Sequence, residues 1–152
     1  MYPKFKATKY ALLVLIVSII SFPFLQGEKY PSFNLEGTDG KQYHQIQFKE
    51  KEFICIILYS NHCKISQSFE GLIKEISEHL VSENSILLLV SPNNENALLP
   101  DELAYSDVGD SINEMRIRSK DRNFEFPYLY DGLEQSISNQ LSAKSTPHAF
   151  LF

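Results

Sequence analysis

The segment LYSNHCKIS, residues 58–66, places Cys63 where an apolar run typical of a strand ends and a helical pattern begins. Backbone N–H groups in the first turn of a helix have no partner within the helix, and together with the helix dipole they stabilise a thiolate over a thiol. The pattern predicts a nucleophilic sulfur that attacks a disulfide or a peroxide. The alternative is an inert thiol.

Two side chains beside Cys63 could assist such a sulfur. Lys64 could stabilise the negative charge of the thiolate, and His62 could carry a proton near neutral pH. The alternative interpretations are a solvated residue at the helix start for Lys64 and a polar turn residue for His62.

The second cysteine, Cys55, lies eight residues before Cys63. Most of that interval reads as a strand that rises about 3.3 Å per residue, which separates the two α-carbons by more than the ~7 Å that a disulfide allows. We therefore expect Cys55 to be a small core residue and no disulfide to join the two cysteines.

Other candidate sites are weaker. His62, Cys63 and His148 could form a soft metal site, but they lack Cys-x-x-Cys or His-x-x-His spacing. The acidic residues of the segment 95–110 fit no EF-hand-type calcium loop. We expect neither a metal nor another cofactor.

Strand-like and helix-like segments alternate along the chain. Residues 53–59 and 85–91 are continuously apolar, as in strands buried on both faces, and Asp39-Gly40 suggests a hairpin around residues 37–43. Apolar residues recur at helical spacing in residues 66–82, with Glu70 on another face. The apolar face of this predicted helix comprises Phe69, Leu72, Ile73, Ile76 and Leu80.

The second half of the chain continues this alternation. A long polar connection, residues 92–110, leads to a predicted helix over about 108–120, with Asp107 or Asp110 near its start. A short strand at 126–130, a helical face marked by Leu133, Ile137 and Leu141, and a final strand at 148–152 follow. The order predicts an α/β fold, a β-α-β sandwich whose central, mostly parallel sheet is flanked by helices.

The N-terminal residues 1–27 differ from the rest of the chain. A cationic stretch precedes an uncharged apolar run, residues 11–25, that is shorter than the ~20 residues of a comfortable membrane span. A signal peptide is the favoured interpretation; bulky residues at 22–25 leave an uncleaved membrane anchor open, and a buried N-terminal helix is the third interpretation. The first two place the domain, residues 28–152, outside the cytoplasm, in the periplasm or anchored in the inner membrane.

Charge limits the partners. The 152 residues carry a net charge of −5, and beyond the first 27 residues 11 basic residues stand against 19 acidic ones. An acidic domain argues against nucleic acid as a partner, and we expect contact with a membrane only through the N-terminal segment.

Three motifs in this order resemble the thioredoxin-like fold, and within it the redoxin branch related to alkyl hydroperoxide reductases and thiol antioxidant proteins. They are YSNHC before a helix, FPYLYD before a short helix, and STPHAFLF. The resemblance covers about residues 30–152 and implies that Cys63 is the first cysteine of the active-site motif. It also implies that Thr146-Pro147 is the cis peptide that faces this cysteine and shapes the substrate groove.

The chain departs from the pattern of that family. Ser66 stands in place of the second cysteine, which turns Cys-x-x-Cys into CKIS, and Ser60 stands where some relatives carry another cysteine. The resemblance further implies a C-terminal strand and helix beyond residue 152, so we expect a C-terminally truncated domain with an uncovered last strand.

Together the residues and the resemblance predict an exported thiol-dependent oxidoreductase or antioxidant protein that acts through one cysteine. Its catalytic group would comprise Cys63 with Ser60, His62, Lys64 and Ser66. The substrate would be a protein disulfide or a peroxide. Without a second thiol nearby, an external thiol reductant or a partner protein must return the oxidised Cys63 to the free thiol. The alternative is a non-catalytic thioredoxin-like binding module that has lost the dithiol.

Overall fold

The computed structural model describes residues 30–96 and 109–152. Six strands form one sheet in the order β2-β1-β5-β4-β3-β6. The strands are β1 (Asn34–Gly37), β2 (Gln42–His44), β3 (Ile54–Leu58), β4 (Ile86–Ser91), β5 (Tyr128–Tyr130) and β6 (His148–Leu151). The helices are the short 3-10 helix η1 (Gln45–Phe48), α2 (Lys64–Ser68), α3 (Glu70–Ser82), α5 (Ile112–Asp121) and α6 (Ser136–Gln140).

The centre of the sheet is parallel. Strand β4 pairs with β3 on one side and with β5 on the other, both in parallel register, while β6 joins β3 and β1 joins β5 in antiparallel register. All five residues of β3 are buried, as expected for a strand covered on both faces. The predicted mostly parallel central sheet is therefore confirmed, and so is the hairpin, which β1 and β2 form.

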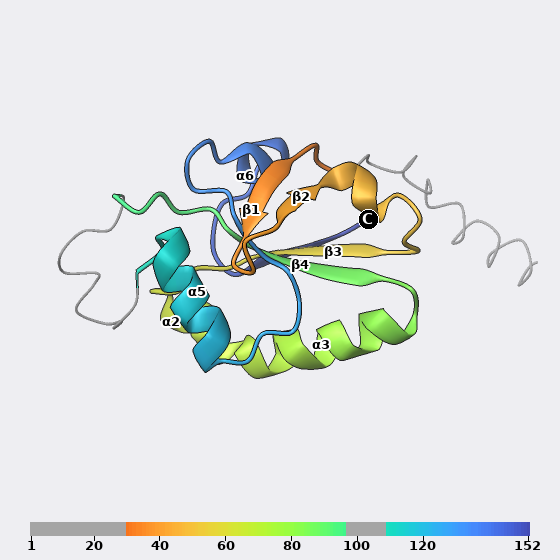
Figure 1. Cartoon of the computed structure of the whole chain (residues 1–152), viewed down its shortest axis with the longest axis horizontal. Helices are drawn as coiled ribbons and strands as arrows, with labels where there is room; N and C mark the ends of the chain where they lie inside the picture. Colours follow the sequence, from red (N-terminus) through yellow and green to blue (C-terminus); the bar gives the residue numbers. More distant parts are fainter. Residues whose placement is uncertain (1–29, 97–108) are drawn as a thin grey trace, which may run out of the picture.

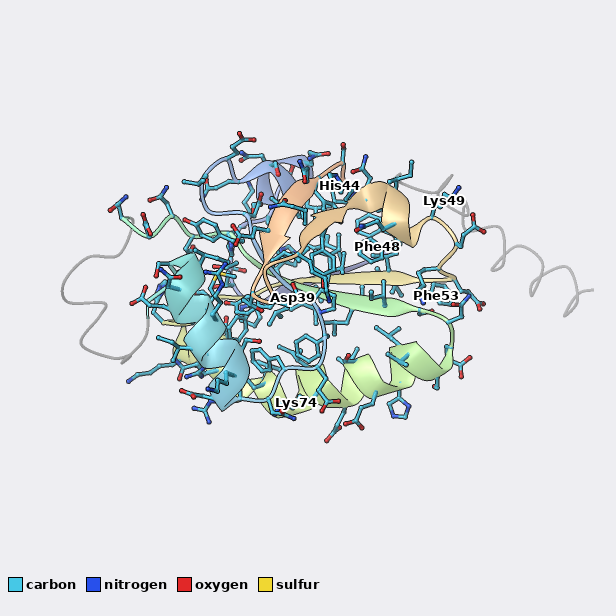
Figure 2. All side chains as sticks on the ribbon, in the orientation of Figure 1. Asp39, His44, Phe48, Lys49, Phe53 and Lys74 are labelled. Atoms are coloured by element: carbon cyan, nitrogen blue, oxygen red, sulfur yellow. The ribbon has the colours of Figure 1, made fainter. Side chains whose placement is uncertain are left out.

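Helices cover both faces of the sheet, with α3 and α5 on one side and η1 and α6 on the other (Figure 1). Alternate residues of β3 point to opposite sides, so Ile56 joins the apolar cluster under η1 and α6, and Ile57 joins the cluster under α3 and α5. Figure 2 shows Phe48 lying between η1 and the sheet. Each face thus has an apolar cluster of its own.

The predicted helix over 66–82 differs from the structure in two respects. It is divided at Phe69 into α2 and α3, and the expected apolar face is only partly buried: Ile73 is buried, whereas Phe69 and Leu72 are 42% and 49% exposed. Glu70, predicted on another face, is buried, because Arg118 donates two hydrogen bonds to its carboxylate at 2.6 and 2.9 Å and the Tyr59 hydroxyl donates a third. A paired carboxylate can be buried where an unpaired one cannot.

The later helices are shorter than predicted. Helix α5 begins at Ile112 with Met115 fully buried, and Asp107 lies outside the described residues. In the region of α6, Ile137 is buried, but Leu133 precedes the helix and is 76% exposed.

Strand β6 is one edge of the sheet, and Leu151 projects from it with 64% of its surface exposed. No helix within residues 30–96 or 109–152 has the length and apolarity needed to cross a membrane. The predicted export segment, residues 1–27, and most of the acidic connection lie outside the described residues.

Candidate active site around Cys63

Cys63 lies at the N-cap of α2, directly after the strand-to-helix turn, and the Thr146-Pro147 loop packs against it. The sulfur lies 3.4 Å from the Thr146 carbonyl oxygen, and the Thr146-Pro147 peptide is cis, as the resemblance predicted. These residues meet because β6 runs antiparallel to β3 with His148 opposite Leu58, so the loop before β6 lies beside the turn after β3.

The surroundings of Cys63 favour a thiolate. Burial raises the pKa of Cys63, but hydrogen bonds from the backbone amide and hydroxyl of Ser66, from the Thr146 side chain and from the Ile65 amide outweigh it, and the net pKa is lowered. A hydrogen bond from the Cys63 thiol to the Thr146 carbonyl oxygen would stabilise the protonated form of the sulfur. The net lowering of the Cys63 pKa means that the groups that donate hydrogen bonds to the sulfur have the larger effect.

Ser66 is placed to act on this sulfur. The side chain is fully buried, and among the described residues its hydroxyl oxygen makes no hydrogen bond of ordinary geometry. A buried hydroxyl without a partner costs about 1–3 kcal/mol. Because the Ser66 hydroxyl also lowers the pKa of Cys63, a thiolate would supply the acceptor that the hydroxyl lacks.

The other cysteine has opposite surroundings. Cys55 points into the cluster under α3 and α5, where burial raises the pKa of its thiol. Both cysteines are free thiols in the structure.

The turn before Cys63 is held by Asp110, which sequence analysis placed only near a helix start. The carboxylate is fully buried and accepts hydrogen bonds from the Asn61 backbone amide at 2.7 Å and the Ser60 hydroxyl at 3.0 Å. His62 Nδ1 lies 2.5 Å from it, and Asn93 Nδ2 donates to it at 2.9 Å. Ser60 and His62 are thus brought together through a residue that the sequence does not connect with them.

Asn61 extends the same network into the core. Its side chain accepts from the Tyr128 hydroxyl at 3.0 Å and donates to the Gly109 carbonyl at 2.7 Å, while its own carbonyl accepts from Gln67 Nε2 at 2.6 Å. The turn is therefore tied to β5, to the segment before α5 and to α2. Its rigidity fixes where the chain enters α2 and thus where Cys63 lies.

A cleft of about 340 Å³ begins at Thr146 and is lined mainly by amide and hydroxyl side chains, among them Asn93, Gln135, Asn139 and Ser145. It offers polar partners next to the cysteine for an extended or small polar ligand.

Lys64 and His148, which the sequence suggested as site residues, are not among the residues described above that hydrogen-bond to Asp110. Lys64 is exposed at the first position of α2. His148 Nδ1 is buried without a hydrogen bond among the described residues, and its ring stacks on Phe150 with centroids 4.2 Å apart. Residues 30–96 and 109–152 contain no group of three or more His, Cys, Asp or Glu residues suited to a metal ion.

Comparison with known proteins places this arrangement in a fold. No family model and no curated protein matches the sequence. An uncharacterised conserved protein from Geobacillus kaustophilus has a TM-score of 0.70 at 20% identity over 83% of the chain, which spans only 62% of that protein. The exposed lipoprotein thioredoxin of Streptococcus pneumoniae matches with a TM-score of 0.62 at 17% identity, over 80% of each chain. A thiol-disulfide oxidoreductase of Bacteroides fragilis matches with a TM-score of 0.58 at 13% identity, over 81% of each chain. The chain therefore has a thioredoxin-like fold.

Proposed function

We propose that the chain is a thiol-dependent oxidoreductase of the redoxin type that works through Cys63 alone. The observation that carries this proposal is the place of Cys63 at the start of α2, with its sulfur 3.4 Å from the Thr146 carbonyl oxygen beside the cis Thr146-Pro147 peptide. Hydrogen bonds at this place lower the pKa of Cys63. The similarity to a thioredoxin and to a thiol-disulfide oxidoreductase supports thiol chemistry as the general class.

The proposed reaction is exchange through a mixed disulfide. The Cys63 thiolate attacks one sulfur of a substrate disulfide, the other sulfur leaves as a thiolate, and an external thiol then attacks the mixed disulfide and releases Cys63. A peroxide would instead oxidise Cys63 to a sulfenic acid, which an external thiol would reduce in two steps. Ser66 cannot replace that thiol, but its hydroxyl can donate to the thiolate.

The remaining site residues take supporting parts. Thr146 and Pro147 form the wall against which a substrate would lie, and the adjoining polar cleft suits a polar disulfide or thiol. The Ser60 hydroxyl is buried and bound to Asp110, so we assign it to holding the turn rather than to contact with a peroxide. Lys64 adds positive charge at the entrance to α2.

Export is also part of the proposal. Residues 1–27 have the charge and hydropathy pattern of a signal peptide or anchor, and one structural neighbour is an exposed lipoprotein. Fractionation of cells that express the full chain should place it in the periplasm or with the membrane, whereas a cytoplasmic location would contradict export.

The test is exchange between 2-hydroxyethyl disulfide and glutathione, followed by glutathione disulfide production. We expect Cys63→Ser to abolish the activity. The matched control is Cys55→Ser, because the Cys55 thiol is buried and takes no part in the site. Activity that survives Cys63→Ser would contradict the proposal, and a folded parent protein with no activity would favour the alternative, a thioredoxin-like binding module without catalysis.

A further inference from the structure

The feature that the proposed reaction leaves unused is the carboxylate of Asp110. It has no exposed surface, and four groups of the site and its surroundings converge on it: the Asn61 amide, the Ser60 hydroxyl, the Asn93 side-chain amide and His62 Nδ1. A buried carboxylate needs such partners to offset the cost of its desolvation, and these partners tie Asp110 to the turn before Cys63.

The position of the proton on His62 follows from these contacts. Nδ1 lies 2.5 Å from Asp110 Oδ2 and 2.8 Å from Ser60 Oγ. An ionised carboxylate only accepts hydrogen bonds, and the Ser60 hydroxyl donates its hydrogen to the same carboxylate. A bare Nδ1 would therefore face oxygen lone pairs on both sides, so Nδ1 carries the hydrogen. In the neutral ring, Nε2 is then the nitrogen without a hydrogen.

We infer that Asp110 is a positioning residue that fixes this tautomer of His62, so that Nε2 acts as the proton carrier for exchange at Cys63. The inference rests on the proposed function and adds a role for Asp110 to it. A buried acid holds a neighbouring histidine in one tautomer in the same way in acyl-transfer enzymes. The His62 side chain is 21% exposed, so it is partly open to solvent, and His62 directly precedes Cys63 in the chain.

The proton balance of the exchange is as follows. When the Cys63 thiolate attacks the disulfide R–S–S–R′, a bond forms between Cys63 and one substrate sulfur, and the S–S bond of the substrate breaks. The departing R′–S⁻ takes the proton from Nε2 of the His62 imidazolium and leaves as R′–SH. An incoming thiol then gives its proton back to Nε2 as its sulfur attacks the mixed disulfide, and Cys63 leaves as a thiolate.

Other ionisable groups surround this pair. Tyr128 and Tyr130 of β5 interact electrostatically with Asp110, and burial raises the pKa of both phenols, so they stay neutral through the working range. Glu114 of α5 binds the amide of Gly109, next to Asp110. Cys63 and Lys64 follow His62 in the chain. None of these groups is changed by the variants below.

The test compares electrophiles whose leaving groups differ in their need for a proton. Iodoacetamide releases iodide and dithiobis(nitrobenzoate) releases a weakly basic aromatic thiolate, whereas 2-hydroxyethyl disulfide releases a basic alkyl thiolate. The ratio of the rate with 2-hydroxyethyl disulfide to the rate with iodoacetamide cancels the thiolate fraction of Cys63. In the parent protein this ratio should depend on pH, because proton transfer from Nε2 assists only the reagent with the basic leaving group.

Two variants decide the inference. Asp110→Asn removes the charge, and His62→Asn keeps a donor at the position of Nδ1 but has no titrating nitrogen. We expect each to lower the rate with 2-hydroxyethyl disulfide by about tenfold or more. The rates with the other two reagents should stay within about twofold of the parent values. In His62→Asn the ratio should become independent of pH. If Asp110→Asn does not fold, His62→Asn decides alone.

The matched control is Glu70→Gln, which neutralises another buried carboxylate, one bound to Tyr59 and Arg118, and should leave the ratio and its pH dependence unchanged. An unchanged ratio in His62→Asn would overturn the inference. So would an equal loss with all three reagents in Asp110→Asn, because Asp110 would then only support the turn. A parent Cys63 that reacts with none of the reagents would instead show that the proposed function itself fails.

Discussion

Cys63 and Cys55 show how eight residues along one segment change the chemistry of a thiol. Cys55 lies in the sheet, where burial raises its pKa, whereas Cys63 lies beyond the end of the strand, where amide and hydroxyl hydrogens point at the sulfur and lower its pKa. The difference comes from position relative to β3 and α2 rather than from the residue type.

The first prediction concerns Ser66. Ser66→Ala removes the buried hydroxyl that lowers the pKa of Cys63, so this pKa should rise, and the pH at which alkylation reaches half of its maximal rate should rise with it. The control is Ser68→Ala, because the Ser68 hydroxyl is exposed and donates to the Ile65 carbonyl. An unchanged pH profile in Ser66→Ala would show that the hydroxyl does not act on the sulfur.

At this scale the sequence predicted the cysteine and its helix start but not the carboxylate behind them. Cys63 and the turn are contiguous in the chain, so their relation can be read from local pattern. Asp110 lies 48 residues beyond His62, and only the fold brings them together. In the sequence, Asp110 appears only as an acidic residue near the start of a helix, a position that the helix dipole explains by itself.

Helix α5 is the element that positions Asp110, and Ser111 is its N-cap. The Ser111 hydroxyl accepts from the Glu114 amide, and the Glu114 carboxylate accepts from the Ser111 amide, which forms a capping box. The sequence SINE, residues 111–114, carries this signature and could have placed the start of the helix correctly.

The second prediction follows from this cap. Ser111→Ala should lower the free energy of unfolding by about 1 kcal/mol at pH 7, measured by urea denaturation. Hydrogen bonding to Ser111 is the largest cause that lowers the pKa of Glu114, so the cap stabilises the fold above the unfolded Glu pKa, and that stability is lost as pH falls through the folded pKa. The variant should therefore lose less stability in acid than the parent. An equal acid loss in both would contradict this account.

The third prediction concerns the contact between α3 and α5. Arg118 is the main partner of the buried Glu70, with hydrogen bonds at 2.6 and 2.9 Å. Arg118→Met would leave that carboxylate without its principal charge partner, so the free energy of unfolding should fall by about 3–5 kcal/mol.

The matched control is Arg116→Met in the same helix. Arg116 pairs with Glu36 at a partly exposed position, where an ion pair contributes about 0–1 kcal/mol. Similar losses in the two variants would mean that burial of Glu70 does not govern the contact.

The elements themselves were predictable to the extent that their patterns were periodic. The continuous apolar runs predicted β3 and β4 almost to the residue, because strands buried on both faces consist mainly of apolar side chains. The helical face over 66–82 was less accurate: Phe69 and Leu72 look like core residues from their spacing alone, yet Phe69 lies between α2 and α3 and both side chains are exposed.

The whole molecule is stabilised by two apolar clusters on either side of the sheet, and the fourth prediction tests one of them. Ile56 is fully buried in the cluster under η1 and α6, so Ile56→Ala should lower the free energy of unfolding by about 2–5 kcal/mol. Leu151→Ala, at the exposed edge strand, should change it by less than about 0.5 kcal/mol. A large loss in Leu151→Ala would show that β6 is covered in solution.

The fold could be predicted from the order of elements together with three short motifs. The alternation of strands and helices indicated a parallel α/β sheet. The cysteine before a helix and the Thr-Pro before the last strand indicated the thioredoxin-like fold among the folds with such a sheet. The relation between these motifs is a property of the whole sheet, because β6 must pair with β3 to bring Thr146 to Cys63.

The central claim is that the Cys63 sulfur is ionised more readily than an ordinary cysteine. The direct measurement is the pH dependence of iodoacetamide alkylation in the native protein, followed for Cys63 and Cys55 by mass spectrometry. We predict a half-point for Cys63 below the ordinary value of ~8.5 and no comparable reaction at buried Cys55. A half-point for Cys63 at or above ~8.5, or a sulfur that does not react, would contradict the account.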